Sequence, residues 1–177
     1  MRRFGPRTFM YRHSLLPVSL QAFPGPQSAR SFGSHSIGRD RDNLGEGGIA
    51  KEGQRGILKR TFSAADVQAF STVTGDWNEV HDVNQSNAVV HGMLCANLIP
   101  ALFAARLPGS VYVSQDLRFS HPVRINETLY AEIIVEKVKD LRGKIVADCN
   151  TAVYRVNDNL RVLHGKARVL LQGERET

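Results

Sequence analysis

An uncharged segment in the middle of the chain decides the fold: residues 92–105 have the sequence GMLCANLIPALFAA. Its large apolar residues point in every direction on a helical wheel, and they are Met93, Leu94, Leu98, Ile99, Leu102 and Phe103. A helix that is apolar on all sides must be enclosed by protein. Pro100 removes one backbone hydrogen bond, so we expect a kink in this helix.

The residues after this helix alternate between apolar and polar with a period of two, which is typical of β-strands. Three apolar faces follow this pattern: Leu129, Ala131, Ile133 and Val135; Ile145, Ala147, Cys149 and Val153; and Leu163, Ala167, Val169 and Leu171. With residues 111–119 added, we expect at least four long strands, joined by turns at 142–143 and 157–159. The sequence therefore predicts an α+β domain in which an antiparallel sheet wraps around one apolar helix.

Charge is distributed unevenly along the chain. The net charge is +6, but residues 1–39 contain six arginines and no acidic residue, so residues 40–177 carry 17 basic and 17 acidic residues. A neutral body gives no support to nucleic-acid binding. The Arg- and Ser-rich, acid-free leader predicts a mitochondrial transit peptide, with a plastid transit peptide or a disordered basic arm as alternatives. No uninterrupted apolar run reaches membrane-spanning length.

Composition divides the chain into four parts. Residues 1–39 are the expected transit peptide. Residues 40–56 are rich in glycine and poor in apolar residues, which predicts a flexible linker. A single ordered domain is expected over 57–171, followed by a short tail over 172–177.

A polar loop precedes the apolar helix, and residues 75–81 have the sequence GDWNEVH. Asp76 and His81 lie five residues apart among turn-forming residues, so a tight loop can direct both side chains toward one spot. An acid and an imidazole placed together can serve as an acid/base pair. Asn78 is expected to hydrogen-bond the backbone of the loop and hold its shape. The alternative is a structural pair in which His81 is a partly exposed loop histidine.

His91 and Gly92 stand at the start of the apolar helix. The first amides of a helix lack intrahelical partners and carry a partial positive charge. A glycine at this position lets a ligand carbonyl approach the backbone, so the Gly92 amide is a candidate to stabilise an enolate-like charge. An ordinary helix-start glycine is the alternative. We expect His91 to orient the loop rather than to act as a catalyst.

Together these residues resemble a known family. The run from Phe62 to Leu171 is similar to the MaoC-like hot dog domain of the (R)-specific enoyl-thioester hydratases, and especially to mitochondrial (R)-3-hydroxyacyl-thioester dehydratases. The matching motifs are Phe62–Val67, Thr74-Gly75-Asp76 with Asn78 and His81, Val90–Leu94, Pro108-Gly109 and Val111–Gln115.

The resemblance implies a hot dog homodimer that reversibly dehydrates (R)-3-hydroxyacyl thioesters to trans-2-enoyl thioesters in mitochondrial type II fatty-acid synthesis. It implies that Asp76 and His81 hold the water that adds to or leaves carbon three, and that the Gly92 amide binds the thioester oxygen. It implies no metal and no cofactor. The acyl chain is expected on acyl carrier protein or coenzyme A, and Arg106, Arg118 and Arg124 are candidate contacts for an acidic carrier protein, or simply solvated charges.

The chain departs from the family in three places. Glu79 replaces a proline, Asn97 replaces a serine found in some relatives, and the segment from Asp82 to Val90 is much shorter than the helix-forming family segment over the acyl pocket. We expect an active enzyme that favours short acyl chains, and the alternative is an enzyme impaired by the loss of this cover. Two alternatives are a hot dog thioesterase and a non-catalytic subunit that binds acyl thioesters.

Four further residues are assigned no catalytic role. His121 and His164 fall within strand patterns. Cys95 and Cys149 lack the spacing of metal ligands, and we expect them to be buried free thiols.

Overall fold

The computed structural model of the protein describes residues 42–47 and 49–171. In chain order these residues form β1 (Arg55–Thr61), α1 (Ala64–Thr74), the 3₁₀ helix η1 (Glu79–His81), α2 (Gly92–Ala96), α3 (Leu98–Arg106), β2 (Val111–Gln115), β3 (Arg118–Phe119), β4 (Thr128–Leu141), β5 (Lys144–Arg155) and β6 (Arg161–Leu171). The expected transit peptide over 1–39 and the expected tail over 172–177 lie outside the described residues. Within the described part, no helix combines the length and apolarity needed to span a bilayer.

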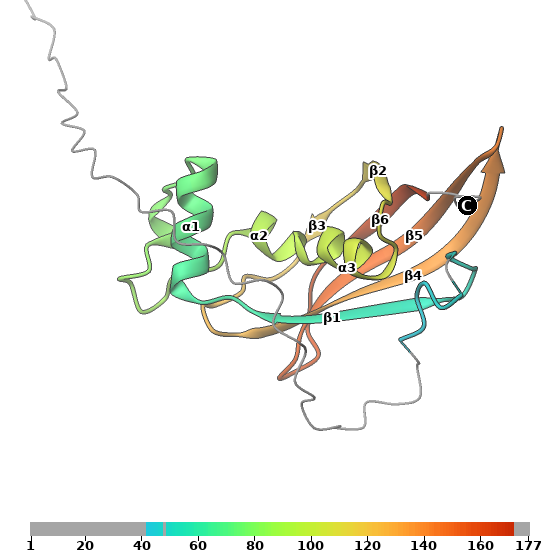
Figure 1. The fold of residues 1–177 in the computed structure, drawn as a ribbon. Helices are drawn as coiled ribbons and strands as arrows, with labels where there is room; N and C mark the ends of the chain where they lie inside the picture. The colour runs from blue at the N-terminus through green and yellow to red at the C-terminus, as the bar shows by residue number, and fades with distance from the viewer. Residues whose placement is uncertain (1–41, 48, 172–177) are drawn as a thin grey trace, which may run out of the picture. The chain divides into compact units, whose positions relative to one another are not determined.

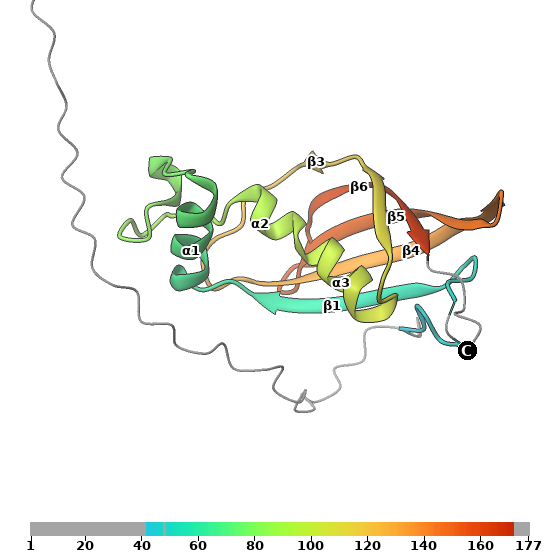
Figure 2. The same ribbon diagram turned by 45° about the horizontal axis from the view of Figure 1, so that its top comes forward.

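The strands form one antiparallel sheet in the order β1-β4-β5-β6-β2, and β3 also pairs with β6. Figures 1 and 2 show α2 and α3 end to end along one face of this sheet. Helix α3 contacts β1, β4 and β5. The prediction of an α+β hot dog fold, with an antiparallel sheet around a central apolar helix, is confirmed.

The core lies between α3 and the sheet. Helix α3 buries Leu98, Ile99, Leu102 and Phe103. The sheet buries apolar side chains on the same alternate positions that the sequence pattern indicates, including Leu129, Ile133, Val153, Leu163 and Val169. Burying each large side chain contributes about 1.5–3 kcal/mol, so this interface is the main source of stability in the domain.

The central helix is interrupted at Asn97, which separates α2 from α3. Pro100 explains the interruption, because it has no N–H to donate to the carbonyl of Ala96, four residues earlier. Within α3, Pro100 lies in the first turn, where a missing N–H costs no intrahelical bond.

One side of the central helix is exposed, which differs from the expected complete enclosure. Met93 is 53% exposed, and the residues that follow it along the same side, Asn97, Ala101 and Ala104, are also exposed. The sheet covers only the opposite side of the helix. A single copy of this domain therefore leaves a largely apolar helix face in contact with solvent.

The segment before β1 is packed, unlike the flexible linker expected over 40–56. Leu44 and Ala50 belong to the core, and the amides of Asn43 and Leu44 both donate to the carbonyl of Arg55 at 2.9 Å. The buried Gln54 side chain accepts a hydrogen bond from the Lys51 amide at 2.9 Å. These apolar and amide contacts fix the described residues of the segment, and the ordered domain begins earlier than expected.

The expected strand over 111–119 is divided into β2 and β3. At the division, the carbonyl of Asp116 approaches Gly165 so closely that a Cβ on residue 165 would lie 1.8 Å from the carbonyl oxygen. Gly165 is therefore required for this close approach.

Both turns predicted between the long strands are present. Arg142 and Gly143 join β4 to β5 with φ values of 58° and 79°, as in the type I′ turn that suits a two-residue hairpin. The β5–β6 connection contains Asn159 at a φ of 54°, and Arg155 forms an ion pair with Asp158 at 2.8 Å.

Candidate active site

The end of α1 places Asp76 beside the core. The helix begins with a capping box in which Ser63 and Asp66 satisfy each other's backbone amides, and it ends at Gly75. Gly75 has a φ of 76°, a left-handed conformation that glycine adopts without a steric penalty. The Gly75 amide donates to the Ser71 carbonyl at 2.8 Å, so the chain turns away from the helix axis at Asp76.

Hydrogen bonds within the loop hold residues 76–81. The Asp76 carboxylate accepts from the Asn78 amide at 3.3 Å, and the Asn78 side chain accepts from the Val80 amide at 3.3 Å. Asn78 is thus the N-cap of η1, whose last residue is His81. These short-range bonds are those that Asx turns use, and they bring Asp76 and His81 to the same side of the loop.

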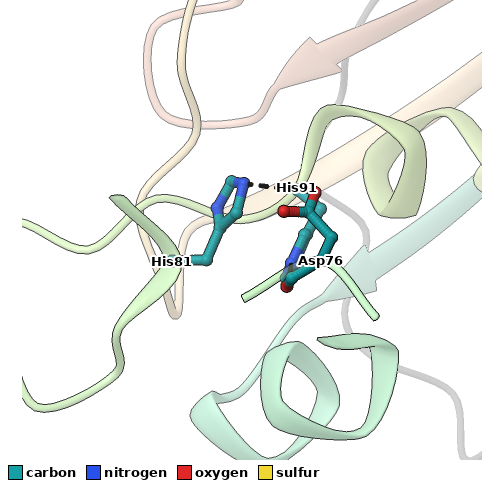
Figure 3. A group of neighbouring side chains, drawn as sticks. All are labelled: Asp76, His81 and His91. Atoms are coloured by element: carbon teal, nitrogen blue, oxygen red, sulfur yellow. Dashed lines mark hydrogen bonds and ion pairs between the residues drawn. The ribbon is translucent and has the colours of Figure 1, made fainter. Parts of the chain in front are cut away.

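His81 presents one free nitrogen to Asp76. Its Nδ1 lies 2.8 Å from the Val89 carbonyl. Because a carbonyl oxygen can only accept, Nδ1 carries the proton and the lone pair of the neutral ring is on Nε2. Nε2 is 3.9 Å from an Asp76 carboxylate oxygen. The dashed line in Figure 3 marks this pair. This distance is too long for a direct hydrogen bond, and it leaves room for an atom that is hydrogen-bonded to both groups.

His91 is buried behind this pair. Its ring stacks on that of His81, with centroids 3.7 Å apart and planes inclined by 26°. Its Nε2 lies 3.2 Å from the Asp76 backbone carbonyl and 3.1 Å from the Ser71 hydroxyl. His91 therefore contacts both members of the Asp76–His81 pair and ties them to α1.

Ser71 is the site residue that the sequence interpretation missed. It is 3% exposed and lies four residues after the buried Val67, on the face of α1 that packs inward. A polar residue on a buried helix face requires a hydrogen-bond partner. That placement was the signal in the sequence, and the partner is His91.

Gly92 is the first residue of α2, and its position is crowded. A Cβ on residue 92 would lie 3.0 Å and 3.1 Å from two carbons of the Phe119 ring. The sequence predicts a long helix whose dipole would add partial positive charge at this amide. Because α2 has only five residues, its dipole is small and adds less charge than expected. The Gly92 amide remains, as a first helical amide, without an intrahelical partner.

A cavity of about 360 Å³ lies against His81 and Gly92. Its remaining walls are largely apolar and include Val89, Phe119 and Leu163. Sites for small molecules usually combine such an apolar lining with a few polar groups. His81 of the pair and the Gly92 amide thus border a space suited to an apolar ligand.

The short connection from Asp82 to Val90 forms turns and no helix. Its start is held by the Asp82 amide, which donates to the Glu79 carbonyl at 3.0 Å, and its end by the Val90 amide, which donates to the Val123 carbonyl at 2.8 Å. Asp76 remains 48% exposed. In a single copy of the domain, the Asp76 side of the site is therefore open to solvent.

The two cysteines are buried and free, as predicted. Burial raises the pKa of Cys95 and of Cys149 to about 12. A thiol with so high a pKa is a poor nucleophile at neutral pH. Although Cys95 borders the cavity, the acid/base pair is the group suited to chemistry there.

The fold and the site define a class: a hot dog domain with an acid and an imidazole facing each other beside a free backbone amide. The chain belongs to the MaoC-like family, because the MaoC like domain matches residues 48–157.

Two relatives and one solved structure illustrate the similarity. The chain is 32% identical over 119 residues to the mitochondrial 3-hydroxyacyl-[acyl-carrier-protein] dehydratase of Arabidopsis thaliana. The aligned residues cover 63% of this chain and 72% of the relative. It is also 33% identical over 128 residues to the (R)-specific enoyl-CoA hydratase of Aeromonas caviae. That alignment covers 67% of this chain and 93% of the relative. The structure of the (R)-hydratase from A. caviae involved in PHA biosynthesis matches with a TM-score of 0.62 and 31% identity, over 69% of this chain and 97% of that one.

Proposed function

We propose that the protein catalyses the reversible dehydration of (R)-3-hydroxyacyl thioesters to trans-2-enoyl thioesters. The observation that carries this proposal is the 3.9 Å gap between His81 Nε2 and the Asp76 carboxylate, beside the Gly92 amide. Relatives named 3-hydroxyacyl-[acyl-carrier-protein] dehydratase and (R)-specific enoyl-CoA hydratase support it.

In the hydration direction, a water molecule sits between Asp76 and His81 and donates one hydrogen bond to the Asp76 carboxylate and one to the lone pair of His81 Nε2. Its oxygen bonds to carbon three of the enoyl thioester, and the electrons of the double bond move toward the thioester carbonyl. The Gly92 N–H donates to the oxygen that gains negative charge. The proton lost by water and the proton gained by carbon two both pass through the Asp76–His81 pair. Dehydration reverses each step.

His91, Ser71 and Asn78 act through the pair. His91 holds the His81 ring by stacking and the Asp76 backbone by a hydrogen bond, while Ser71 holds His91. Asn78 fixes the loop between the two reacting groups. These positioning contacts lower the cost of ordering the acid/base pair before reaction.

The open side of the site favours short acyl chains. A long apolar chain needs a cover that excludes water, and the turns over 82–90 provide no helix for that purpose. The same openness is the reason to consider a subunit that binds acyl thioesters without turnover, since exclusion of water strengthens electrostatic catalysis.

One assay separates these functions. Crotonyl-CoA is incubated with the protein while enoyl absorbance and free thiol are followed in parallel. A dehydratase lowers the absorbance without releasing thiol. Release of thiol without hydration identifies a thioesterase, and binding without either change identifies a non-catalytic subunit.

A homodimer completes the proposal, because one copy leaves apolar side chains exposed. Val111 and Val113 of β2 are 56% and 59% exposed, and Met93 of α2 is 53% exposed. Strand β2 ends the strand order of the described sheet and so offers an edge for pairing. Val113→Asp should shift the mass measured by light scattering from dimer to monomer. Leu141→Asp, at another exposed apolar position, is the matched control.

The mitochondrial matrix is the proposed location, and acyl carrier protein or coenzyme A the proposed carrier. The Arabidopsis relative is named mitochondrial, and the leader has the composition of a transit peptide. Arg106 and Arg124 already contact Asp42 and the Asn87 carbonyl, so the exposed Arg118 is the better candidate for a carrier contact. A fluorescent protein fused to residues 1–40 should enter mitochondria, and cytosolic fluorescence would contradict this location.

A further inference from the structure

Asp76, His81 and His91 form a group of potential metal ligands (Figure 3). Each residue offers one ligand atom, and the three atoms lie within 4.8 Å of one another. They come from three places in the chain: the loop after α1, the end of η1 and the residue before α2. Imidazole nitrogens and a carboxylate oxygen are ligands that zinc takes in sites with three protein ligands and one open position.

The His81 ring has the orientation of a metal-binding histidine. Metal-ligating histidines usually donate their second N–H to a backbone carbonyl or a carboxylate, which fixes the tautomer. His81 donates from Nδ1 to the Val89 carbonyl at 2.8 Å, and this leaves the Nε2 lone pair directed toward Asp76.

His91 has hydrogen-bonding capacity that the fold does not use. The side chain is 2% exposed, and its Nδ1 is buried without a hydrogen-bond partner among the described residues. A buried polar atom without a partner costs free energy, so binding of a ligand to this ring is favoured because it removes that cost. The ligand atom of His91 lies within 4.8 Å of those of Asp76 and His81, and the ring must tilt out of its stack on His81 for both lone pairs to meet one ion.

The three ligand atoms lie within 4.8 Å of one another and must move closer, by at most about 1.4 Å, to reach zinc distances. With bonds of about 2.0–2.1 Å, a tetrahedral ion holds its ligand atoms roughly 3.4 Å apart. The 3.9 Å separation of His81 and Asp76 therefore needs to contract by about 0.5 Å. The Asp76 carboxylate can supply this movement, because it is 48% exposed and accepts a 3.3 Å bond from the Asn78 amide.

We propose that this group binds a zinc ion that reversibly inhibits the enzyme. The ion takes the lone pair of His81 and the carboxylate of Asp76, which are the groups that hold the reacting water. Its fourth position stays open to a water molecule. Binding of the ion follows from the geometry alone, whereas inhibition rests on the proposed function.

Binding is tested by titrating the full chain with zinc chloride in a calorimeter. Asp76→Asn and His81→Gln should each weaken the binding of one equivalent at least tenfold, since loss of even an outer-shell contact weakens metal sites by about 10–100-fold. Glu79→Gln is the matched control, because it removes an exposed carboxylate from the same loop that lies outside the group. Equal affinity in the wild type, Asp76→Asn and His81→Gln would overturn the site.

Inhibition is tested by crotonyl-CoA hydration at increasing zinc concentration. Zinc should abolish hydration at the concentration that fills the site, and magnesium, which prefers oxygen ligands, should not. Hydration that continues unchanged with the site filled would overturn the inhibitory role. A protein that binds zinc as expected but never hydrates crotonyl-CoA would retain the metal site and contradict the proposed function, so the two failures are distinguishable.

Discussion

Gly92→Ala tests whether the Gly92 amide takes part in the reaction. The new methyl group would meet the Phe119 ring at 3.0–3.1 Å. Overpacking costs about 1–3 kcal/mol in a tight core, whereas alanine gains about 0.5–1 kcal/mol over glycine in a helix. Because the Phe119 side chain is 53% exposed and can turn aside, the cost falls at the low end. We expect the free energy of unfolding to change by less than about 1 kcal/mol.

Activity should fall much more than stability. Loss of one donor to a developing oxyanion typically lowers kcat by about 10²–10³-fold. A methyl group beside the amide hinders the thioester oxygen without removing the N–H, so we expect the lower limit, about 10²-fold, or about 2.7 kcal/mol. The assay is steady-state hydration of crotonyl-CoA, with urea unfolding measured on the same preparations.

A double variant separates amide access from crowding. Phe119→Ala removes the ring that the new methyl group would touch. If the amide binds the thioester oxygen, Gly92→Ala should lower kcat by the same factor in the wild type and in the Phe119→Ala background. Full recovery of activity in the double variant, to the level of Phe119→Ala alone, would refute the role of the amide.

Three further predictions concern the surroundings of the site. Ser71→Ala removes the hydroxyl bonded to His91, so urea unfolding should show a loss of about 1–3 kcal/mol and hydration should slow. Hydrogen bonds from the capping box, mainly from the Ser63 backbone amide, lower the pKa of Asp66. The contribution of the Asp66 carboxylate to the free energy of unfolding is therefore complete above the ordinary pKa near 3.9, and it is lost as the pH falls through the lower pKa of the folded state. Asp66→Asn should therefore destabilise the protein at pH 7 but have little effect at pH 2. Cys95 and Cys149 should react with a thiol reagent only after unfolding, because burial raises their pKa to about 12; rapid reaction of the native protein would contradict this.

The arrangement of the sheet was predictable because each strand carries its own alternating pattern. The three long strands bury the predicted faces, and the turn at Arg142-Gly143 lies where the pattern ends. The packing of Leu44 and Ala50 was not predictable, since two isolated apolar residues in a glycine-rich segment give no period. Their burial depends on contacts with distant parts of the chain, which the local sequence does not specify.

The residues around the site were predictable only in part. Asp76, Asn78 and His81 lie in one loop, where turn-forming residues and short-range hydrogen bonds reveal their proximity. The stacking of His91 on His81 depends on how the connection over 82–90 returns to α2, and its length alone does not fix this geometry. The contact of Ser71 with His91 spans 20 residues and arises from tertiary packing.

The most direct test of the proposed reaction is the kcat/KM of crotonyl-CoA hydration in the wild type, Asp76→Asn and His81→Ala. Positioned acid/base groups contribute about 10²–10⁴-fold, so each substitution should lower kcat/KM at least about 100-fold. Circular dichroism should show an unchanged fold, and Glu79→Gln should retain wild-type activity as the control from the same loop. Hydration at a wild-type rate by either Asp76→Asn or His81→Ala would contradict the assignment of the reaction to this pair.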